Sequence, residues 1–592
     1  MDREEILNQA NELISNKNFK EAKSVLEQYI EESKAEDAET QKTLGLCNIN
    51  LDIYDQAKIN FENVIAINED DATSWFYLGM IYESLEDPTK AQNAYEKVIL
   101  LRKDYKDAYK NIAVLNLKQK NNDTALEFAQ KALDTDNTDY QIYYIIGTAY
   151  TAKKEYEKAA EALNKGIELN PEHPLMYNNL GSCYLALKRV DDAKNAFLKA
   201  VELGPDNATS LYNLGTTYQL KQEAEKAYDC LKKAYQIDPS EFYLSAAALA
   251  SVNANAWSDA VKFYTSLVNL HPEKQNFQYN LACSLQSIGE YDKAIKILSQ
   301  LVLVNPKSIA MGQRLAKCYE STNNLAMAKN TYANLIRLGK VPPEVYYSYA
   351  IVCMKTDDKD KAENIFKKVI QLDPKNPYAH KDLGVVYLSQ RLFDYAKDEF
   401  MAAYKMAPND GSVNFEIANF YYATGDYKAA TPYYDKANEL EPDIMDIAVF
   451  RGLNQIALNN TDKALEIFTE AMQKYPSQHI ILSNLGLLYY KKGSFETAKE
   501  FLTDAFSLFQ DDETMNALAL TFFELKEYEN ARNIAQKLIL KYPENINILL
   551  LLAKCSIELT DAENSVKYLD KIMEIFPEQP EAKELYERIK GA

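Results

Sequence analysis

One unit of about 34 residues recurs along the chain and limits what it can fold into. Tyr177 to Pro205 reads YNNLGSCYLALKRVDDAKNAFLKAVELGP, and the next copy, Leu211 to Pro239, places its small residues and its proline at matching positions. With Gly181 counted as position eight, a glycine or alanine stands at this position in seventeen copies, spaced by 33 to 35 residues. Such a chain favours a one-dimensional repeat array over separate globular domains.

Each copy contains two helical patterns that have small residues in common places. The stretch from Tyr177 to Tyr184 follows the i, i+3, i+4, i+7 spacing of a helix with one buried face. Alanine recurs twelve residues after position eight, from Ala22 to Ala531, and only the last copy differs, with Ser565. Glycines between the two patterns, such as Gly289 and Gly425, suit a left-handed helix end. We therefore predict helical hairpins whose two helices approach closely at these small residues.

These hairpins resemble the tetratricopeptide repeat. Its pattern W-x2-LG-x2-Y, A-x3-F, A and P is met by Trp75, Leu78, Gly79, Tyr82, Ala91 and Tyr95, and by Tyr177, Leu180, Gly181, Tyr184, Ala193, Phe197, Ala200 and Pro205. The resemblance covers essentially the whole chain and implies an all-α, right-handed superhelical solenoid with a concave groove lined mainly by the first helix of each repeat. We expect a continuous array of about seventeen repeats over residues 1–577 and a C-terminal capping helix over residues 578–592.

The charge balance narrows the class of partner. The chain carries 87 acidic and 66 basic residues, a net charge of −21, which repels phosphate backbones and anionic lipid. We therefore expect a protein or peptide partner, with basic or extended segments favoured, and neither nucleic acid nor a membrane surface. The N-terminus MDREEILNQA has no secretion leader, so we expect a soluble, cytoplasmic protein. The sequence leaves the oligomeric state open.

No constellation of residues indicates catalysis, a metal site or a cofactor. The seven cysteines contain no C-x-x-C pair, and four of them fall in one column of the repeat, which predicts packing: Cys47, Cys183, Cys318 and Cys555. The four histidines lie in different repeats at unrelated positions: His173, His271, His380 and His479. Acidic pairs such as Asp191-Asp192 and Asp511-Asp512 are typical of turns and helix N-termini. We therefore predict a protein that is not an enzyme.

The groove is predicted from positions two, five, nine and twelve of the first helix, which are turned away from the core stripe. Position five alternates between aromatic and polar residues in eleven consecutive copies: Phe76, Lys110, Tyr144, Asn178, Tyr212, Ser245, Tyr279, Gln313, Tyr347, Lys381 and Phe415. One interpretation is a ladder of exposed aromatic platforms on the groove wall for an extended chain. The other is that tyrosine is simply common in this column of the family. Both interpretations stay open.

Position six offers further candidates. The asparagines in this column resemble those that bind peptide backbone in the repeat arm of O-linked N-acetylglucosamine transferases, and they are Asn111, Asn179, Asn213, Asn280 and Asn484. The column is interrupted and the transferase domain is missing, so the resemblance implies backbone binding at Asn179 and Asn213 and no transferase activity. Asn280 followed by Arg314 resembles part of a two-carboxylate clamp for chaperone C-termini, and the other clamp residues are missing. Arg314 together with Lys317 can still attract a carboxylate.

The sequence therefore predicts a non-enzymatic scaffold that binds a peptide or protein in its concave groove. The alternative is a substrate-presenting or regulatory arm for a separate glycosyltransferase or other protein-modifying enzyme. RNA binding by a helical-repeat code is disfavoured by the negative charge and by the lack of a recurring pair of base-reading residues.

Overall fold

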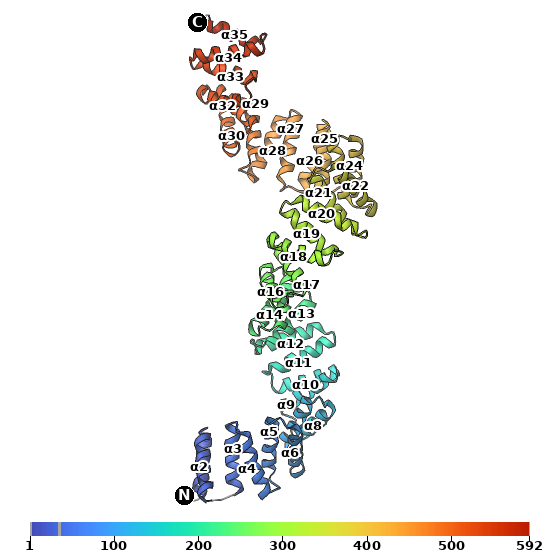
Figure 1. The fold of residues 1–592 in the computed structure, drawn as a ribbon, viewed down its shortest axis with the longest axis vertical. Helices are drawn as coiled ribbons and strands as arrows, with labels where there is room; N and C mark the ends of the chain where they lie inside the picture. Colours follow the sequence, from blue (N-terminus) through green and yellow to red (C-terminus); the bar gives the residue numbers. More distant parts are fainter. Residues whose placement is uncertain (1–2, 34–36, 591–592) are drawn as a thin grey trace. The chain divides into compact units, whose positions relative to one another are not determined.

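The computed structural model describes residues 3–33 and 37–590, and these residues form α-helices with no β-strand among them. The helices follow one another in pairs joined by short turns (Figure 1). Contacts within the chain divide it into two units, residues 1–297 and 298–592, and the boundary falls inside helix α18 (Tyr291–Val304).

The first unit contains seventeen helices before α18, counted over its described residues. They are α1 (Arg3–Ser15), α2 (Phe19–Ser33), α3 (Ala38–Asn50), α4 (Tyr54–Ile67), α5 (Ala72–Ser84), α6 (Pro88–Leu101), α7 (Lys106–Lys118), α8 (Asn122–Thr135), α9 (Tyr140–Ala152), α10 (Tyr156–Leu169), α11 (Pro174–Ala186), α12 (Val190–Leu203), α13 (Ala208–Leu220), α14 (Ala224–Ile237), α15 (Glu241–Asn253), α16 (Trp257–Leu270) and α17 (Gln275–Ser287).

The second unit likewise contains seventeen helices after α18 in the part that is described. They are α19 (Ile309–Ser321), α20 (Leu325–Arg337), α21 (Pro343–Lys355), α22 (Lys359–Leu372), α23 (Pro377–Ser389), α24 (Phe393–Met406), α25 (Gly411–Ala423), α26 (Tyr427–Leu440), α27 (Met445–Ala457), α28 (Thr461–Lys474), α29 (His479–Lys491), α30 (Phe495–Leu508), α31 (Asp512–Glu524), α32 (Tyr528–Lys541), α33 (Ile546–Glu558), α34 (Ala562–Ile575) and α35 (Pro580–Lys590).

Odd-numbered helices up to α33 are the first helices of the repeats, and even-numbered helices are the second helices. Within each unit, a first helix packs on the second helix that follows it, as α11 on α12 and α29 on α30, and α35 packs on α33 and α34. Within each unit, the more extensive contacts between alternate helices join first helices, as in α7 with α9 and α23 with α25. Neighbouring repeats therefore come closest on the side of the first helices.

The two helices of a repeat touch at position eight. A Cβ atom added to Gly181 in α11 would lie 2.7 Å from the ring of Phe197 in α12, and one added to Gly452 would lie 2.6 Å from the ring of Phe468. The alanine twelve residues later, Ala193, is fully buried. The predicted close approach is confirmed, because the ring of the second helix occupies the space of a side chain on the first.

The last repeat keeps a small buried residue in the alanine column despite its different sequence. Ser565 is 1% exposed, and its hydroxyl donates to the backbone carbonyls of Asp561 and Ala562, both at 2.9 Å. The serine therefore satisfies its own hydroxyl within α34, so that the column stays small and apolar toward α33.

The cysteine column is also part of the packing. Cys47, Cys183, Cys318 and Cys555 are fully buried. Burial raises the pKa of Cys47 to about 11 and that of Cys555 to about 12. These groups therefore remain thiols at neutral pH, which agrees with the packing role predicted for this column.

Glycine at the turn within a repeat adopts the left-handed conformation that the sequence predicted. Gly289 and Gly425 both have φ of +82°, and Gly493 has φ of +75°. In other repeats the same turn places a non-glycine residue in this region, for example Lys188 with φ of +61°. These turns therefore carry a conformational cost that the glycine-containing repeats avoid.

Ala193→Asp is expected to unfold the chain locally, because a buried carboxylate with no partner costs several kcal/mol. Hydrogen exchange should lose protection in α11 to α14 and keep it in α3 and α4, since each repeat contacts only its neighbours. Asn195→Asp, on the exposed face of the same helix, is the control and should change little. Uniform loss of protection through residues 3–297 would contradict this picture.

Gly425→Ala should cost about 1 kcal/mol, because alanine is strained at positive φ. Its added Cβ would meet no atom within 4 Å, so the backbone alone is tested. Amides of α25 should then exchange roughly fivefold faster. Gly384→Ala is the steric counterpart, since its Cβ would lie 2.8 Å from the ring of Phe400, and it should cost more. Equal hydrogen exchange in the wild type and in Gly425→Ala would show that alanine is not strained at this turn.

Candidate binding surface

The aromatic residues of position five lie between consecutive repeats. All of them are half-buried, and four contact a ring of the next repeat. These contacts, by centroid distance, are Phe76 with Tyr105 at 5.1 Å, Tyr144 with His173 at 5.6 Å, Tyr212 with Phe242 at 4.7 Å, and Phe415 with Phe450 at 5.8 Å. The sequence interpretation placed these rings on an open wall, whereas the structure gives them packing contacts between repeats as well.

Tyr347 makes a polar contact in the same position. Its hydroxyl donates to Asp382 Oδ2 of the next repeat at 2.5 Å, and Asp382 is only 8% exposed. Lys381 Nζ lies 3.3 Å from the other carboxylate oxygen. Burial, followed by the charge of Asp382, raises the pKa of Tyr347 above its ordinary value. The remaining member of the column, Tyr279, is half-buried on α17.

The predicted asparagines already use their amide groups inside the protein. Asn213 Nδ2 donates to Asn178 Oδ1 at 2.9 Å, and Asn179 Nδ2 lies 3.5 Å from Thr148 Oγ1. Asn280 Nδ2 donates to the hydroxyl of Tyr264 at 3.1 Å. Each asparagine therefore has one amide hydrogen engaged within the protein.

The bond between Asn280 and Tyr264 has a counterpart elsewhere in the chain with the same sequence spacing, which the sequence analysis did not identify. Asn111 Nδ2 donates to the Tyr95 hydroxyl at 3.2 Å, and sixteen residues separate this pair just as sixteen separate Asn280 from Tyr264. An asparagine at position six thus accompanies a tyrosine on the preceding second helix, whose buried hydroxyl needs a partner.

The two residues that resemble part of a carboxylate clamp belong to different units. Arg314 is half-buried on α19 in the second unit, while Asn280 belongs to the first.

A pocket of about 490 Å³ opens between α7, α9 and the start of α11. Its lining residues are Lys110, Asn111, Val114, Leu117, Lys118, Tyr140, Gln141, Tyr144, Ile145 and His173. Tyr144 is the one predicted site residue among them. Gln141, Lys110, Val114 and Leu117 nevertheless occupy positions two, five, nine and twelve of their first helices, which are the columns that the sequence analysis assigned to the groove.

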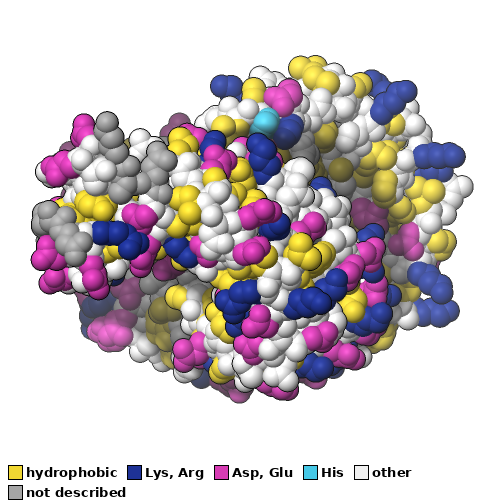
Figure 2. All heavy atoms as spheres, turned by 90° about the horizontal axis from the view of Figure 1, so that it is seen from below, with side chains coloured by type: hydrophobic (Ala, Val, Ile, Leu, Met, Phe, Trp, Pro, Cys, Tyr) yellow, Lys and Arg dark blue, Asp and Glu magenta, His cyan; other side chains and the backbone are white. Residues whose placement is uncertain are grey.

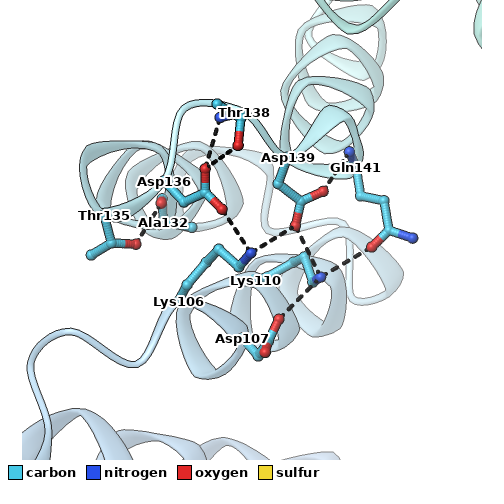
Figure 3. Close-up of polar contacts among 9 residues, drawn as sticks. All are labelled: Lys106, Asp107, Lys110, Ala132, Thr135, Asp136, Thr138, Asp139 and Gln141. Carbon is cyan, nitrogen blue, oxygen red and sulfur yellow. Dashed lines mark hydrogen bonds and ion pairs between the residues drawn. The ribbon is translucent and has the colours of Figure 1, made fainter. Parts of the chain in front are cut away.

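Ion pairs between repeats hold the polar rim of this pocket (Figure 3). Lys110 Nζ lies 3.2 Å from Asp139 Oδ2 and donates to Gln141 Oε1 at 3.0 Å. Lys106 Nζ lies 2.8 Å from Asp136 Oδ2, and this contact holds the pKa of Asp136 well below its ordinary value. The start of α7 is therefore tied to the turn between α8 and α9.

The side of the pocket toward α5 carries a different pair. Lys118 Nζ lies 3.2 Å from Glu83 Oε2, and the lysine side chain is 66% exposed. Glu83 also accepts a hydrogen bond from the Tyr95 hydroxyl at 2.8 Å. Among the residues that the structure describes, none of those lining the pocket is acidic, although acidic and basic side chains are interspersed on the molecular face shown in Figure 2.

His380 and Asp511 make polar contacts within the protein. His380 Nδ1 lies 2.6 Å from Glu399 Oε2. Asp511 caps α31 by accepting from the backbone N–H groups of Glu513 and Thr514, as expected for an acidic residue at a helix N-terminus. Within the described ranges, no group of three or more His, Cys, Asp or Glu side chains could hold a metal ion.

Paired helices with a shared surface of first helices define a helical-repeat solenoid protein. Family models described as tetratricopeptide repeat match residues 78–141, 172–240, 277–308, 343–376, 411–444, 451–506 and 522–589. The chain belongs to the tetratricopeptide repeat family. A model described as anaphase-promoting complex, cyclosome, subunit 3, also matches residues 118–200.

Curated relatives match parts of the chain. YpiA of Bacillus subtilis, a TPR repeat-containing protein, is 23% identical over 306 residues, which cover 50% of this chain and 70% of YpiA. Anaphase-promoting complex subunit CDC16 of Saccharomyces cerevisiae is 21% identical over 293 residues, 48% of this chain and 34% of CDC16. This chain thus spans about a third of CDC16.

The structure is also similar to a solved one. The APC/C hetero-tetramer Cut9–Hcn1 matches over 82% of this chain and 96% of that chain, with 17% identity and a TM-score of 0.34. In the described part of this chain, none of the helices is long and apolar enough to cross a membrane.

Tyr347→Phe should destabilise the packing of α21 on α23, because a buried carboxylate loses a hydrogen-bond donor at a cost of about 1–3 kcal/mol. Hydrogen exchange in these two helices should become at least about fivefold faster. Tyr346→Phe removes a hydroxyl from the neighbouring half-buried ring and should have little effect.

The Tyr347 contribution should also depend on pH with a defined sign. Folding raises the pKa of this phenol above its ordinary value of 10.0, so its stabilising effect is complete below that pH and is lost as the pH rises further. Identical exchange in wild type and Tyr347→Phe at pH 7 would show that the Asp382 contact stabilises nothing.

Proposed function

We propose that this chain is a protein-interaction scaffold that holds a peptide or protein segment on its first-helix surface, meaning positions two, five, nine and twelve of the first helices. The observation that carries the proposal is the pocket between α7, α9 and α11, which draws residues from these columns and from three consecutive repeats. A concave site with apolar walls and a few polar groups is typical of ligand recognition.

Exposed apolar residues extend this surface beyond the pocket. Met80 on α5 is 39% exposed and Leu249 on α15 is 51% exposed, and both stand at position nine. Neither residue is needed to fill the core, because the buried stripe of each first helix lies on another face. Such residues supply the contact area that a partner would cover.

The relatives and the charge support the same proposal. CDC16 is, by its name, a subunit of the anaphase-promoting complex, so a related array of repeats works inside a protein assembly. The net charge of −21 supports a protein or peptide partner over nucleic acid, because affinity for nucleic acid depends on neutralising phosphates with basic side chains. At long range this charge favours basic segments in the partner.

The test compares two double variants of the full-length chain. Met80→Asp with Leu249→Asp alters the first-helix surface, and Ile59→Asp with Leu198→Asp alters second helices. The wild-type residues are 39% and 51% exposed in the first variant and 53% and 40% in the second, so the two variants are matched in exposure. Proteins captured from an extract of the source cells should fall by at least about tenfold for the first variant and hardly change for the second.

Equal capture by both variants would contradict binding on the first helices. A greater loss with the second variant would move the binding surface to the second helices. Specific capture of a glycosyltransferase or another modifying enzyme would favour the alternative, in which the chain presents substrates to that enzyme.

A further inference from the structure

We propose that the pocket between α7, α9 and α11 receives one large apolar side chain from an extended partner segment, and that Lys118 selects an acidic residue beside it. This inference rests on the proposed function and names the chemistry of the partner. It assigns a recognition role to pocket residues in two adjacent repeats, on α7 and α9.

The size and lining of the pocket can accommodate a large apolar side chain. Its volume of about 490 Å³ lies within the range of roughly 300 to 1,000 Å³ for ligand sites. Val114 and Leu117 from α7 and Tyr144 and Ile145 from α9 contribute its apolar lining. An aromatic or long aliphatic side chain placed here would bury its surface against both apolar walls, which is the main source of affinity at an anchor residue.

The rim offers hydrogen bonds to an extended backbone. Asn111 uses Nδ2 to bind Tyr95, and Gln141 uses Oε1 to bind Lys110. No described residue pairs with Asn111 Oδ1 or with Gln141 Nε2, which leaves an acceptor on α7 and a donor on α9. A backbone that crosses the pocket can offer an N–H to the first and a carbonyl to the second. These contacts depend little on the sequence of the segment.

We assign the selection of an acidic residue to Lys118 because, of the two lysines that line the pocket, it is the one that can leave its present ion pair and bind a carboxylate of the segment. Its ion pair with Glu83 joins a lysine side chain that is 66% exposed to a carboxylate that is 20% exposed, so the lysine end of the pair can turn into solvent. Glu83 would keep the hydrogen bond from Tyr95 after Lys118 moves. Lys110, by contrast, is only 18% exposed and is shared between Asp107 and Asp139.

The negative charge of the whole chain does not oppose an acidic neighbour at this point. Charges are screened over a Debye length of about 8 Å at physiological ionic strength. A carboxylate at the rim would therefore respond mainly to the charges close to it. These are the two lining lysines and the acids paired with them, Asp107, Asp139 and Glu83. Distant acidic residues would act chiefly on the approach of the partner.

Exposed apolar residues on the flanking first helices favour an extended segment over a small molecule as the occupant. Met80 lies on α5, before the pocket, and Leu175 on α11, beyond it, and they are 39% and 42% exposed. A segment anchored in the pocket could cover these residues in both directions, whereas a small molecule would leave them in water.

The experiment selects displayed random dodecapeptides against the full-length chain. Recovered peptides should share a Phe, Trp, Tyr, Leu or Met next to an Asp or Glu. Val114→Trp fills the pocket and should weaken these peptides by at least about tenfold. Leu198→Trp, on the exposed face of second helix α12, adds a ring outside the first-helix surface and should leave their binding unchanged.

A second variant tests the charge without altering the apolar walls. Selection against Lys118→Glu should replace the acidic neighbour with Lys or Arg and keep the apolar anchor. Lys165→Glu makes the same charge change on an exposed face of second helix α10, and its selected peptides should match those of the wild type.

The outcomes separate this inference from the function on which it rests. If peptides are recovered but Val114→Trp, confirmed as folded by its thermal unfolding, binds them like the wild type, the pocket assignment is wrong while the scaffold proposal stands. If Lys118→Glu selects the same acidic peptides, the charge assignment is wrong. If no peptide is recovered and the first-helix double variant also captures proteins normally, the proposed function itself fails.

Discussion

The contact between the two helices of each repeat is the constraint on which the rest of the structure depends. A side chain at position 181 would overlap the ring of Phe197, which the added Cβ approaches to 2.7 Å. The glycine therefore sets how near the helices come, and the buried alanine Ala193 lets them stay near along the next turns. Because this contact recurs from repeat to repeat, the first helices present the same four columns, positions two, five, nine and twelve, away from the core. The first-helix surface proposed for binding is a consequence of this packing.

The contacts between neighbouring repeats differ from place to place along that surface. Tyr212 packs on Phe242, whereas Tyr347, in the same column, donates a hydrogen bond to Asp382. One column thus joins neighbouring repeats by ring packing at one place and by a buried polar contact at another. These residues stabilise the stack while part of each remains exposed, so a single substitution can alter both stability and recognition. Exposed residues such as Met80 separate the two effects better.

Local charge and total charge act on different steps of recognition. The net charge of −21 influences which proteins approach, but screening limits its reach to a short distance from the surface. The pocket between α7, α9 and α11 is lined by two lysines and a histidine, and the nearby acids Asp139 and Glu83 already pair with those lysines. Composition alone predicts a basic partner, whereas the geometry of this pocket favours an acidic residue beside an apolar anchor.

The sequence by itself determined the repeating helix pairs, the small residues at their contact and the left-handed glycine turns, because each follows from spacing within some thirty residues. It also identified the four columns that supply much of the pocket. Only the tertiary structure decided which side chains share a pocket, since Tyr144 lines one together with Val114 and Leu117 of the preceding repeat. The asparagines show the same limit: Asn280 was predicted to bind a peptide, and its amide donates to Tyr264. Hydrogen bonds between helices depend on the orientations of two side chains at once, and a column of residue types does not specify these.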